Sequence, residues 1–199
     1  MSRRWFLGSV VAAAAGVTAT TAGQTVPGLS ELNVLGPRTP GRGQGLQRLP
    51  VNRTAGAAGV HSAASSPDYR LRVTGAVARP LELTVQELED QARHTVDLPL
   101  TCVEGWSVGA HWTGIRLRDL LQQAGAEPGC EVRVESLEAG GLYRTSHVNS
   151  AHAWSSSTVL ATAVDGQRLD LDHGYPLRLL APSRPGVLQT KWLSEVVVL

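Results

Sequence analysis

The sequence predicts a mixed α+β fold that consists mostly of β-strands, and three observations support this prediction. Segments in which apolar and polar residues alternate, which is the period of a half-buried strand, outnumber segments with helical periodicity. The predicted helices are short and scattered, whereas a doubly wound parallel sheet needs a helix between successive strands. No GxGxxG or GxxxxGKS/T pattern follows a predicted strand, so the usual dinucleotide and nucleoside triphosphate sites are unsupported.

The regular part of the sequence begins at residue 69, where apolar and polar residues alternate as in a strand. Thr84 and Glu87 form the capping-box pattern of a short helix that ends near Ala92. Asp165-Gly166 is a typical hairpin turn between two apolar segments. The other predicted elements are a helix over residues 115–124 and strands over residues 95–100, 131–135, 159–164, 167–171, 177–181 and 193–199.

The chain divides into three parts by composition. Arg3 and Arg4 precede an uncharged run from residue 5 to 24, which resembles a twin-arginine export signal. We therefore expect residues 1–24 to be a twin-arginine signal or a membrane anchor, with residues 5–22 as the anchoring part. Residues 25–66 are rich in Pro and Gly and predict a linker, and residues 67–199 predict the folded domain.

These features predict an exported protein in the periplasm or at the outer face of the cytoplasmic membrane. Of the 199 residues, 42% are hydrophobic and 18% are charged, and the formal net charge is +1. This balance is unlike that of a disordered chain or a general polyanion binder, so no nucleic-acid partner is expected.

Two clusters of residues carry the chemical information. Residues 101–114, TCVEGWSVGAHWTG, place a cysteine at the end of a predicted strand among aromatic residues and glycines, as in a shaped pocket. Residues 171–192, LDHGYPLRLLAPSRPGVLQTKW, contain one histidine, two arginines and the single lysine of the chain.

Together the two clusters resemble the molybdopterin-binding domain of the sulfite oxidase family, and more closely its bacterial branch that includes the catalytic subunit of periplasmic methionine sulfoxide reductase. The resemblance spans residues 67–199 and implies a sulfite-oxidase-like molybdopterin-binding fold. It also implies a molybdenum-molybdopterin cofactor, with Cys102 as the catalytic residue and metal ligand. A soft thiolate suits this metal, and a single protein ligand leaves positions open for oxygen-atom transfer.

The implied activity is an oxidoreductase reaction, either oxygen-atom transfer or related two-electron chemistry on a small oxyanion or sulfoxide-type substrate. The implied electron partner is a membrane b-type cytochrome, which is either a separate protein or fused to the domain in longer relatives. Arg178 and Lys191 match the positions that anchor the pterin phosphate. The residues that the resemblance assigns to the cofactor are Asn52, Arg53, Cys102, Ser136, His173, Arg178, Gln189, Thr190 and Lys191. Asn52 and Arg53 lie inside the linker, in a stretch over residues 49–60.

Alternatives follow from the residue types. A disulfide between Cys102 and Cys130 would be ordinary in an exported protein and would suit a cofactor-free binding module on the same fold. A hydrolase with Cys102 as nucleophile would need a histidine beside the thiol. Arg178 and Lys191 could also lie on a solvated face.

Overall fold

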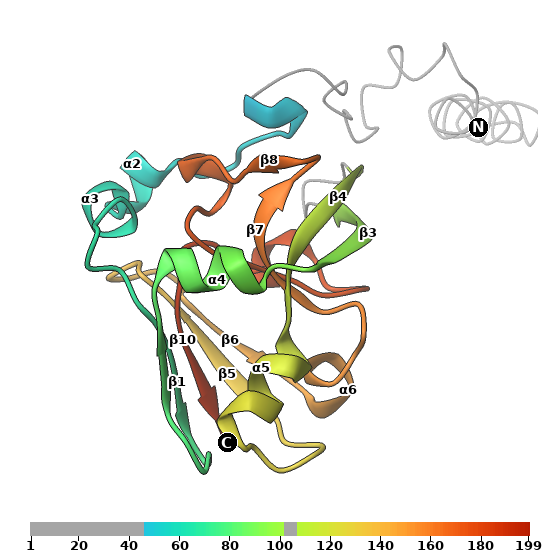
Figure 1. Cartoon of the computed structure of the whole chain (residues 1–199). Helices are drawn as coiled ribbons and strands as arrows, with labels where there is room; N and C mark the ends of the chain where they lie inside the picture. The colour runs from blue at the N-terminus through green and yellow to red at the C-terminus, as the bar shows by residue number, and fades with distance from the viewer. Residues whose placement is uncertain (1–45, 102–106) are drawn as a thin grey trace, which may run out of the picture. The chain divides into compact units, whose positions relative to one another are not determined.

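The computed structural model describes residues 46–101 and 107–199, which form two five-stranded sheets with short helices at their edges (Figure 1). This confirms the predicted α+β fold that consists mostly of strands. The predicted export signal or anchor lies outside the described residues. Among the described helices, none has the length and apolar character that crossing a bilayer requires.

The first sheet has the strand order β2-β1-β10-β5-β6, so the last strand of the chain lies in the middle. Strand β10 runs parallel to β1 and antiparallel to β5, and the other neighbours in the sheet are antiparallel. The strands are β1 (Leu71–Gly75), β2 (Leu81–Leu83), β5 (Val132–Ser136), β6 (Thr145–Val148) and β10 (Leu193–Val198).

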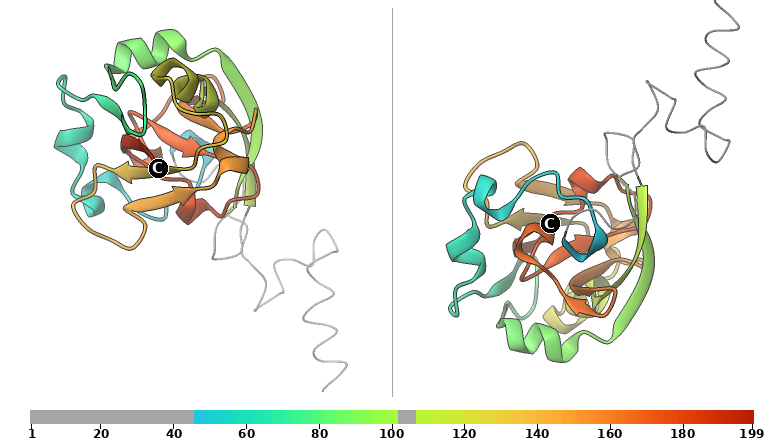
Figure 2. Two further views of the ribbon diagram at one scale, coloured as in Figure 1. Left: turned by 90° about the horizontal axis from the view of Figure 1, so that it is seen from below. Right: turned by 90° about the horizontal axis from the view of Figure 1, so that it is seen from above.

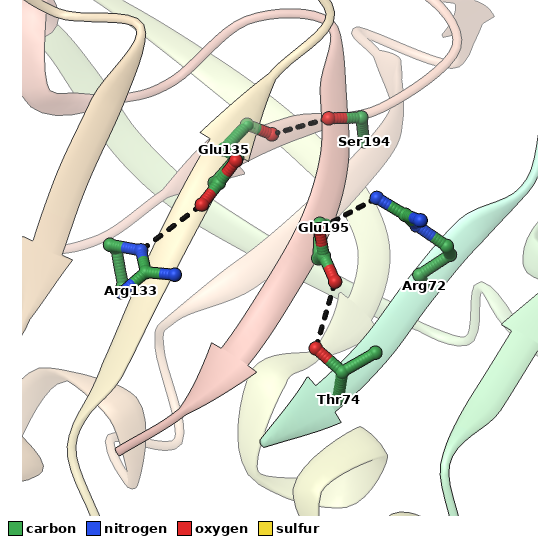
Figure 3. Close-up of polar contacts among 6 residues, drawn as sticks. All are labelled: Arg72, Thr74, Arg133, Glu135, Ser194 and Glu195. Carbon is green, nitrogen blue, oxygen red and sulfur yellow. Dashed lines mark hydrogen bonds and ion pairs between the residues drawn. The ribbon is translucent and has the colours of Figure 1, made fainter.

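The two faces of this sheet follow the alternation in the sequence. Leu71, Val73 and Val196 are buried on the inner face. On the outer face the Arg72 guanidinium lies 2.7 Å from the Glu195 carboxylate, which also accepts a hydrogen bond from Thr74 (Figure 3). The outer face therefore carries charged residues in ion pairs, as solvent-facing strands do.

The second sheet has the order β3-β4-β7-β8, and β9 also pairs with β7. Asp165 and Gly166 both have positive φ angles, 47° and 75°, as the two central residues of a tight hairpin turn require, which confirms the predicted turn. The strands are β3 (His94–Thr101), β4 (Ser107–Arg116), β7 (Val159–Val164), β8 (Gln167–Arg168) and β9 (Arg178–Leu180).

Helix α4 (Val85–Gln91) has the predicted capping box, in which the Thr84 hydroxyl accepts from the Glu87 amide and the Glu87 carboxylate accepts from the Thr84 amide. Helix α5 begins at Leu117 rather than at Ile115, because Ile115 and Arg116 pair with β7 as the end of β4. The remaining helices are short: η2 (Leu46–Arg48), α2 (Ala55–Ala58), α3 (His61–Ala64), α6 (Ser150–Ala153), η3 (Leu171–His173) and η4 (Gly186–Leu188).

The main core fills the space between the first sheet, helix α5 (Leu117–Ala124) and the inner residues of β7 and β9. A smaller apolar cluster lies apart from it, where Ala55, Val60 and Ala64 pack against Trp192. The small cluster attaches the N-terminal segment of α2 and α3 to the residues that precede β10. This attachment positions one side of the site described next.

Candidate functional site

Two loops that are distant in the sequence meet through backbone hydrogen bonds. The first runs from η3 to β9, and the second precedes β10. The Leu179 amide donates to the Thr190 carbonyl at 2.9 Å, and the Trp192 amide donates to the Gly174 carbonyl at 3.3 Å. Residues 190–192 therefore lie directly against residues 174–179.

Gly174 makes room for two cationic side chains at this junction. Its φ angle is 112°, and a Cβ atom built there would lie 3.2 Å from the Cβ atoms of Arg178 and Lys191. A residue with a side chain would be strained by both the dihedral angle and the contact. The glycine of the HGYPLR segment thus lets Arg178 and Lys191 lie on either side of one backbone turn.

Arg178 is a buried cation whose side chain makes a hydrogen bond to a backbone carbonyl. Its side chain is 5% exposed, and one terminal nitrogen donates to the His173 carbonyl at 3.1 Å. The guanidinium lies 5.4 Å from the centre of the Trp112 ring, while its Nε has no hydrogen-bond partner among the described residues. Burial lowers the pKa of Arg178 to about 10, so the group is still charged at neutral pH. This location excludes the solvated-face alternative for Arg178.

Lys191 is held beside Arg178 by backbone carbonyls. Its Nζ donates to the carbonyl of Asp172 at 3.0 Å and to the carbonyl of Arg53, and it lies 4.3 Å from the centre of the Trp192 ring. Burial lowers the pKa of Lys191 to about 7, and the charge of Arg178 also lowers it. An anion near Nζ would favour the protonated form.

Gln189 and Thr190, the residues before this lysine, are also buried, with 2% and 3% of their surfaces exposed. The Gln189 side-chain amide donates to the Arg184 carbonyl at 3.0 Å. Its Oε1 and the Thr190 hydroxyl have no hydrogen-bond partner among the described residues. Buried polar atoms of this kind are uncommon in native proteins and indicate a bound ligand or water.

Ser136 contacts the backbone of Lys191, and the backbone of His173 contacts the side chain of Arg178. The Ser136 hydroxyl donates to the Lys191 carbonyl at 2.8 Å and accepts from the Glu138 amide at 3.2 Å. His173 is buried, and its carbonyl accepts a hydrogen bond from the Arg178 guanidinium. Both residues therefore lie next to Arg178 and Lys191, and their contact with the cofactor stays a prediction.

The N-terminal segment reaches the same site. Arg53 accepts from Lys191 through its carbonyl, and its guanidinium lies 3.2 Å from the Glu138 carboxylate. The next residues are fixed by the Ala55 amide, which donates to the Asp172 carboxylate at 2.8 Å. Asn52 is exposed and directly precedes Arg53. The structure thus brings the predicted pair Asn52 and Arg53 next to Lys191.

Cys102, the predicted metal ligand, lies outside the described residues. Thr101, which precedes it at the end of β3, lies against the second loop, because a Cβ atom at Gly186 would be 2.9 Å from the Thr101 carbonyl oxygen. Cys130 is a free thiol, and burial raises its pKa. The alternative function as a cofactor-free binding module requires Cys130 in a disulfide, and the structure does not support it.

Three further residues shape the site but were not predicted from the sequence. Arg184 is buried and donates to the His147 carbonyl and the Ser146 hydroxyl, at 2.9 and 3.0 Å. Asp172 and Glu138 hold the N-terminal segment. Arg184 and Asp172 lie inside the HGYPLR-containing segment, so their charge was a usable signal, whereas Glu138 is far in sequence from Arg53 and gave none.

The site is therefore positively charged and has unused hydrogen-bonding capacity. Within residues 46–101 and 107–199, no carboxylate forms an ion pair with Arg178 or Arg184. The same ranges contain no group of three or more His, Cys, Asp or Glu side chains that could hold a metal ion. Cationic side chains of this kind, with hydrogen-bonding capacity left over, suit an anionic group such as a phosphate.

The sequence profile of the oxidoreductase molybdopterin binding domain matches residues 57–199. The chain belongs to this family. Sulfite oxidase of Rattus norvegicus is 34% identical over 161 residues, which cover 66% of this chain and 29% of that protein. Nitrate reductase of Hordeum vulgare is 32% identical over 171 residues, which cover 69% of this chain and 19% of that protein.

A solved structure gives the same result. The sulfane dehydrogenase SoxCD from Paracoccus pantotrophus is similar with a TM-score of 0.60 and 25% identity, over 66% of this chain and 38% of that chain. The chain thus spans less than a third of the two curated relatives and about two fifths of this structural neighbour. The fold is the sulfite-oxidase-like molybdopterin-binding fold that the sequence predicted.

Molybdopterin is the cofactor of this family, and the residues of the site fit it. The pterin ends in a phosphate, which needs fixed positive charge and hydrogen-bond donors. Arg178 offers a buried charge, and its Nε, the Thr190 hydroxyl and the Gln189 side-chain oxygen have no hydrogen-bond partner among the described residues. These groups could hold the phosphate and the polar edge of the pterin.

Proposed function

We propose that this chain is a molybdenum-molybdopterin oxidoreductase that carries out oxygen-atom transfer or related two-electron chemistry. The observation that carries the proposal is Arg178, a buried cation that no carboxylate of the described residues pairs with, beside Lys191 and Gly174 in a domain of the molybdopterin-binding family. Burying a cation without a counter-ion is costly. The cost is understandable where an anionic cofactor supplies the missing charge.

Each residue has a role in this proposal. Arg178 and Lys191 bind the phosphate, while Ser136 and the His173 carbonyl fix the positions of these two cations. Gln189, Thr190 and Asn52 contact the pterin, and Arg53 holds Lys191 through its backbone carbonyl. Cys102 supplies the thiolate ligand of molybdenum. When bound, the cofactor supplies reversible two-electron redox chemistry, and the protein contributes binding, orientation and electrostatics.

The substrate in this proposal is a small oxyanion or sulfoxide-type molecule. Sulfite oxidases and nitrate reductases are among the relatives, and both are named for reactions of oxyanions. The electrons pass to or from a membrane b-type cytochrome. Arg3, Arg4 and the uncharged run that follows support export, and we place the protein in the periplasm or at the outer face of the cytoplasmic membrane.

The decisive experiment is to produce the full chain in a molybdenum-replete host and to measure molybdenum and pterin per folded chain. We expect about one molybdenum atom per chain in the wild type, since one thiolate and one pterin hold one metal. In Cys102→Ser the metal content should fall close to zero. Cys130→Ser is the matched control, because it removes the only other thiol, and it should keep the wild-type content.

A folded wild-type protein from this host without molybdenum or pterin would remove the proposal. Equal metal loss in the two cysteine variants would show that the assignment of Cys102 is wrong. Retention of the metal in Cys102→Ser would have the same meaning. Circular dichroism of each variant establishes that the fold is intact before the metal is compared.

A further inference from the structure

The N-terminal segment over residues 46–64, which we call the strap, packs separately from the main core. Its apolar residues Ala55, Val60 and Ala64 contact Trp192 in the small cluster, not the core between the sheets. In both views of Figure 2 the α2 and α3 part of the strap runs beside the loop that joins β5 to β6. None of the residues of the strap belongs to the main core, although Leu49 of the strap is itself 1% exposed.

Polar contacts attach the strap to residues on both sides of the site. The Gln47 side chain donates to the Arg168 carbonyl at 2.7 Å and accepts from the Asp170 amide at 2.9 Å. Further along the strap, the Ala55 amide donates to the Asp172 carboxylate at 2.8 Å. Between these two attachments the strap passes over the ammonium group of Lys191.

A closed ring of contacts connects this part of the strap to the site. The Lys191 ammonium donates to the Arg53 carbonyl, and the Arg53 guanidinium pairs with the Glu138 carboxylate. The Glu138 amide donates to the Ser136 hydroxyl, which in turn donates to the Lys191 carbonyl. Glu138 is the one member of the ring that contributes a negative charge.

Glu138 is well placed to hold the strap. Its side chain is 12% exposed, against 46% for Arg53, so the carboxylate is the more firmly packed partner. The loop closes tightly around the pair, because a Cβ atom at Gly141 would lie 3.3 Å from the Glu138 carboxylate and 3.4 Å from the Arg53 guanidinium. A pair that is partly shielded from water is screened less than an exposed one.

We propose that Glu138 is a positioning residue that holds the strap over Lys191 and thereby slows the release of bound molybdopterin. This inference rests on the proposed function, because it concerns the same cofactor. Glu138 acts through Arg53 and the strap and does not itself contact the cofactor. The strap covers the ammonium group that binds the phosphate, so release requires the strap to open.

The test compares Glu138→Gln with Glu195→Gln in the full-length, cofactor-loaded protein. Glu195 is a matched control, since its carboxylate also pairs with an arginine and is 15% exposed, but it lies on the outer face of the first sheet. We expect molybdopterin release after dilution to be roughly five- to tenfold faster in Glu138→Gln, as loss of one partly buried ion pair predicts. The control should release it at the wild-type rate.

A second measurement does not need the cofactor. In the cofactor-free protein, hydrogen exchange at the amides of residues 55–60 should be faster in Glu138→Gln and unchanged in Glu195→Gln. The double charge reversal Arg53→Glu with Glu138→Arg should restore slow exchange and slow release, because the strap uses the Arg53 carbonyl and not its side chain to reach Lys191.

Each outcome decides the question. Wild-type exchange and release in Glu138→Gln would overturn the positioning role. The double reversal could restore slow exchange but not slow release. This result would mean that the Arg53 guanidinium contacts the cofactor directly, and it would also overturn the positioning role of Glu138. If the wild type binds no molybdopterin, the proposed function fails, and hydrogen exchange alone still shows whether Glu138 holds the strap.

Discussion

The outer face of the first sheet and the cofactor site use arginine in opposite ways. On the outer face Arg72 lies 2.7 Å from Glu195, and Arg133 lies 3.1 Å from Glu135, on strands that water reaches (Figure 3). In the site Arg178 and Arg184 are buried, and no carboxylate among the described residues forms an ion pair with either. The exposed arginines, which water already stabilises, thus form ion pairs with carboxylates. The buried Arg178 and Arg184 donate hydrogen bonds only to neutral groups among the described residues.

This difference indicates that the buried arginines, and not the exposed ones, serve to bind a ligand. Exposed ion pairs contribute little to stability, about 0 to 1 kcal/mol. A buried cation without a counter-ion lowers stability, because the desolvation of the charge is not offset. Burial accordingly lowers the pKa of both Arg178 and Arg184. Experiments can separate the two regions. Mutations in the cofactor site should change ligand binding, and mutations on the outer face of the first sheet should leave it almost unchanged.

The largest effect is expected for Arg178→Met. Loss of the buried charge should weaken molybdopterin binding by about 2 kcal/mol, roughly thirtyfold, since hydrogen bonds to charged groups contribute about 1.5 to 3 kcal/mol. The cofactor-free variant should be as stable as the wild type or more stable, because methionine fills similar space without a desolvated charge. Cofactor content and urea unfolding of the cofactor-free protein measure the two effects. A large loss of stability with normal cofactor content would show that Arg178 is structural.

A smaller effect should appear in the pH dependence of binding. The pKa of Lys191 in the cofactor-free protein is about 7, below its usual value of 10.5. Between these values the unfolded chain binds more protons than the folded one, so the contribution of Lys191 to the free energy of unfolding rises with pH. Phosphate binding favours the protonated amine, so the affinity for molybdopterin should fall above pH 7, by at most about tenfold per pH unit.

Titrations of the cofactor-free protein with molybdenum-molybdopterin at several pH values between 6 and 9 measure this dependence. Lys191→Arg is the matched control, because an arginine in this place keeps its charge over the whole range. Its affinity should change less with pH than that of the wild type. The same slope in both proteins would assign the dependence to the ligand and contradict the prediction for Lys191.

The smallest effect is expected for Arg72→Met on the outer face. Removing this exposed partner of Glu195 should change the free energy of unfolding by less than about 1 kcal/mol. Cofactor content should stay at the wild-type value, because the pair lies on the solvent side of the sheet. Cofactor loss in Arg72→Met comparable to that in Arg178→Met would remove the distinction between the two regions.

The elements that the sequence predicted well are those with local signals. The Thr84 capping box and the Asp165-Gly166 turn depend on residues within one turn of each other, and the structure confirms both. Strand β4 was not predicted, although its side chains alternate between exposed and buried from Ser107 to Trp112, because its glycines and aromatic residues are also typical of a shaped pocket. The parallel pairing of β1 with β10 depends on residues at opposite ends of the domain, and no local pattern encodes it.

The site was predictable to a similar degree. The segment around HGYPLR places Arg178 and Lys191 within one short stretch, and the structure brings both beside Gly174, while their joint role stays a prediction from the family resemblance. That Arg178 is buried could not be read from a strand in which leucines flank it on both sides, because either face of a strand can be the solvated one. The role of Glu138 could not be predicted from the sequence, because Arg53 pairs with it only in the folded structure, where the strap lies against the domain.

The central position of β10 also limits when the domain can become functional. The first sheet lacks its middle strand until residues 193–198 have been synthesised, so β1 and β5 have no common neighbour before that moment. Lys191 and Trp192 are synthesised immediately before this strand. The nascent chain can therefore neither complete its sheet nor close the pocket for the phosphate until β10 has been made, so loading with the prosthetic group must follow the synthesis of β10.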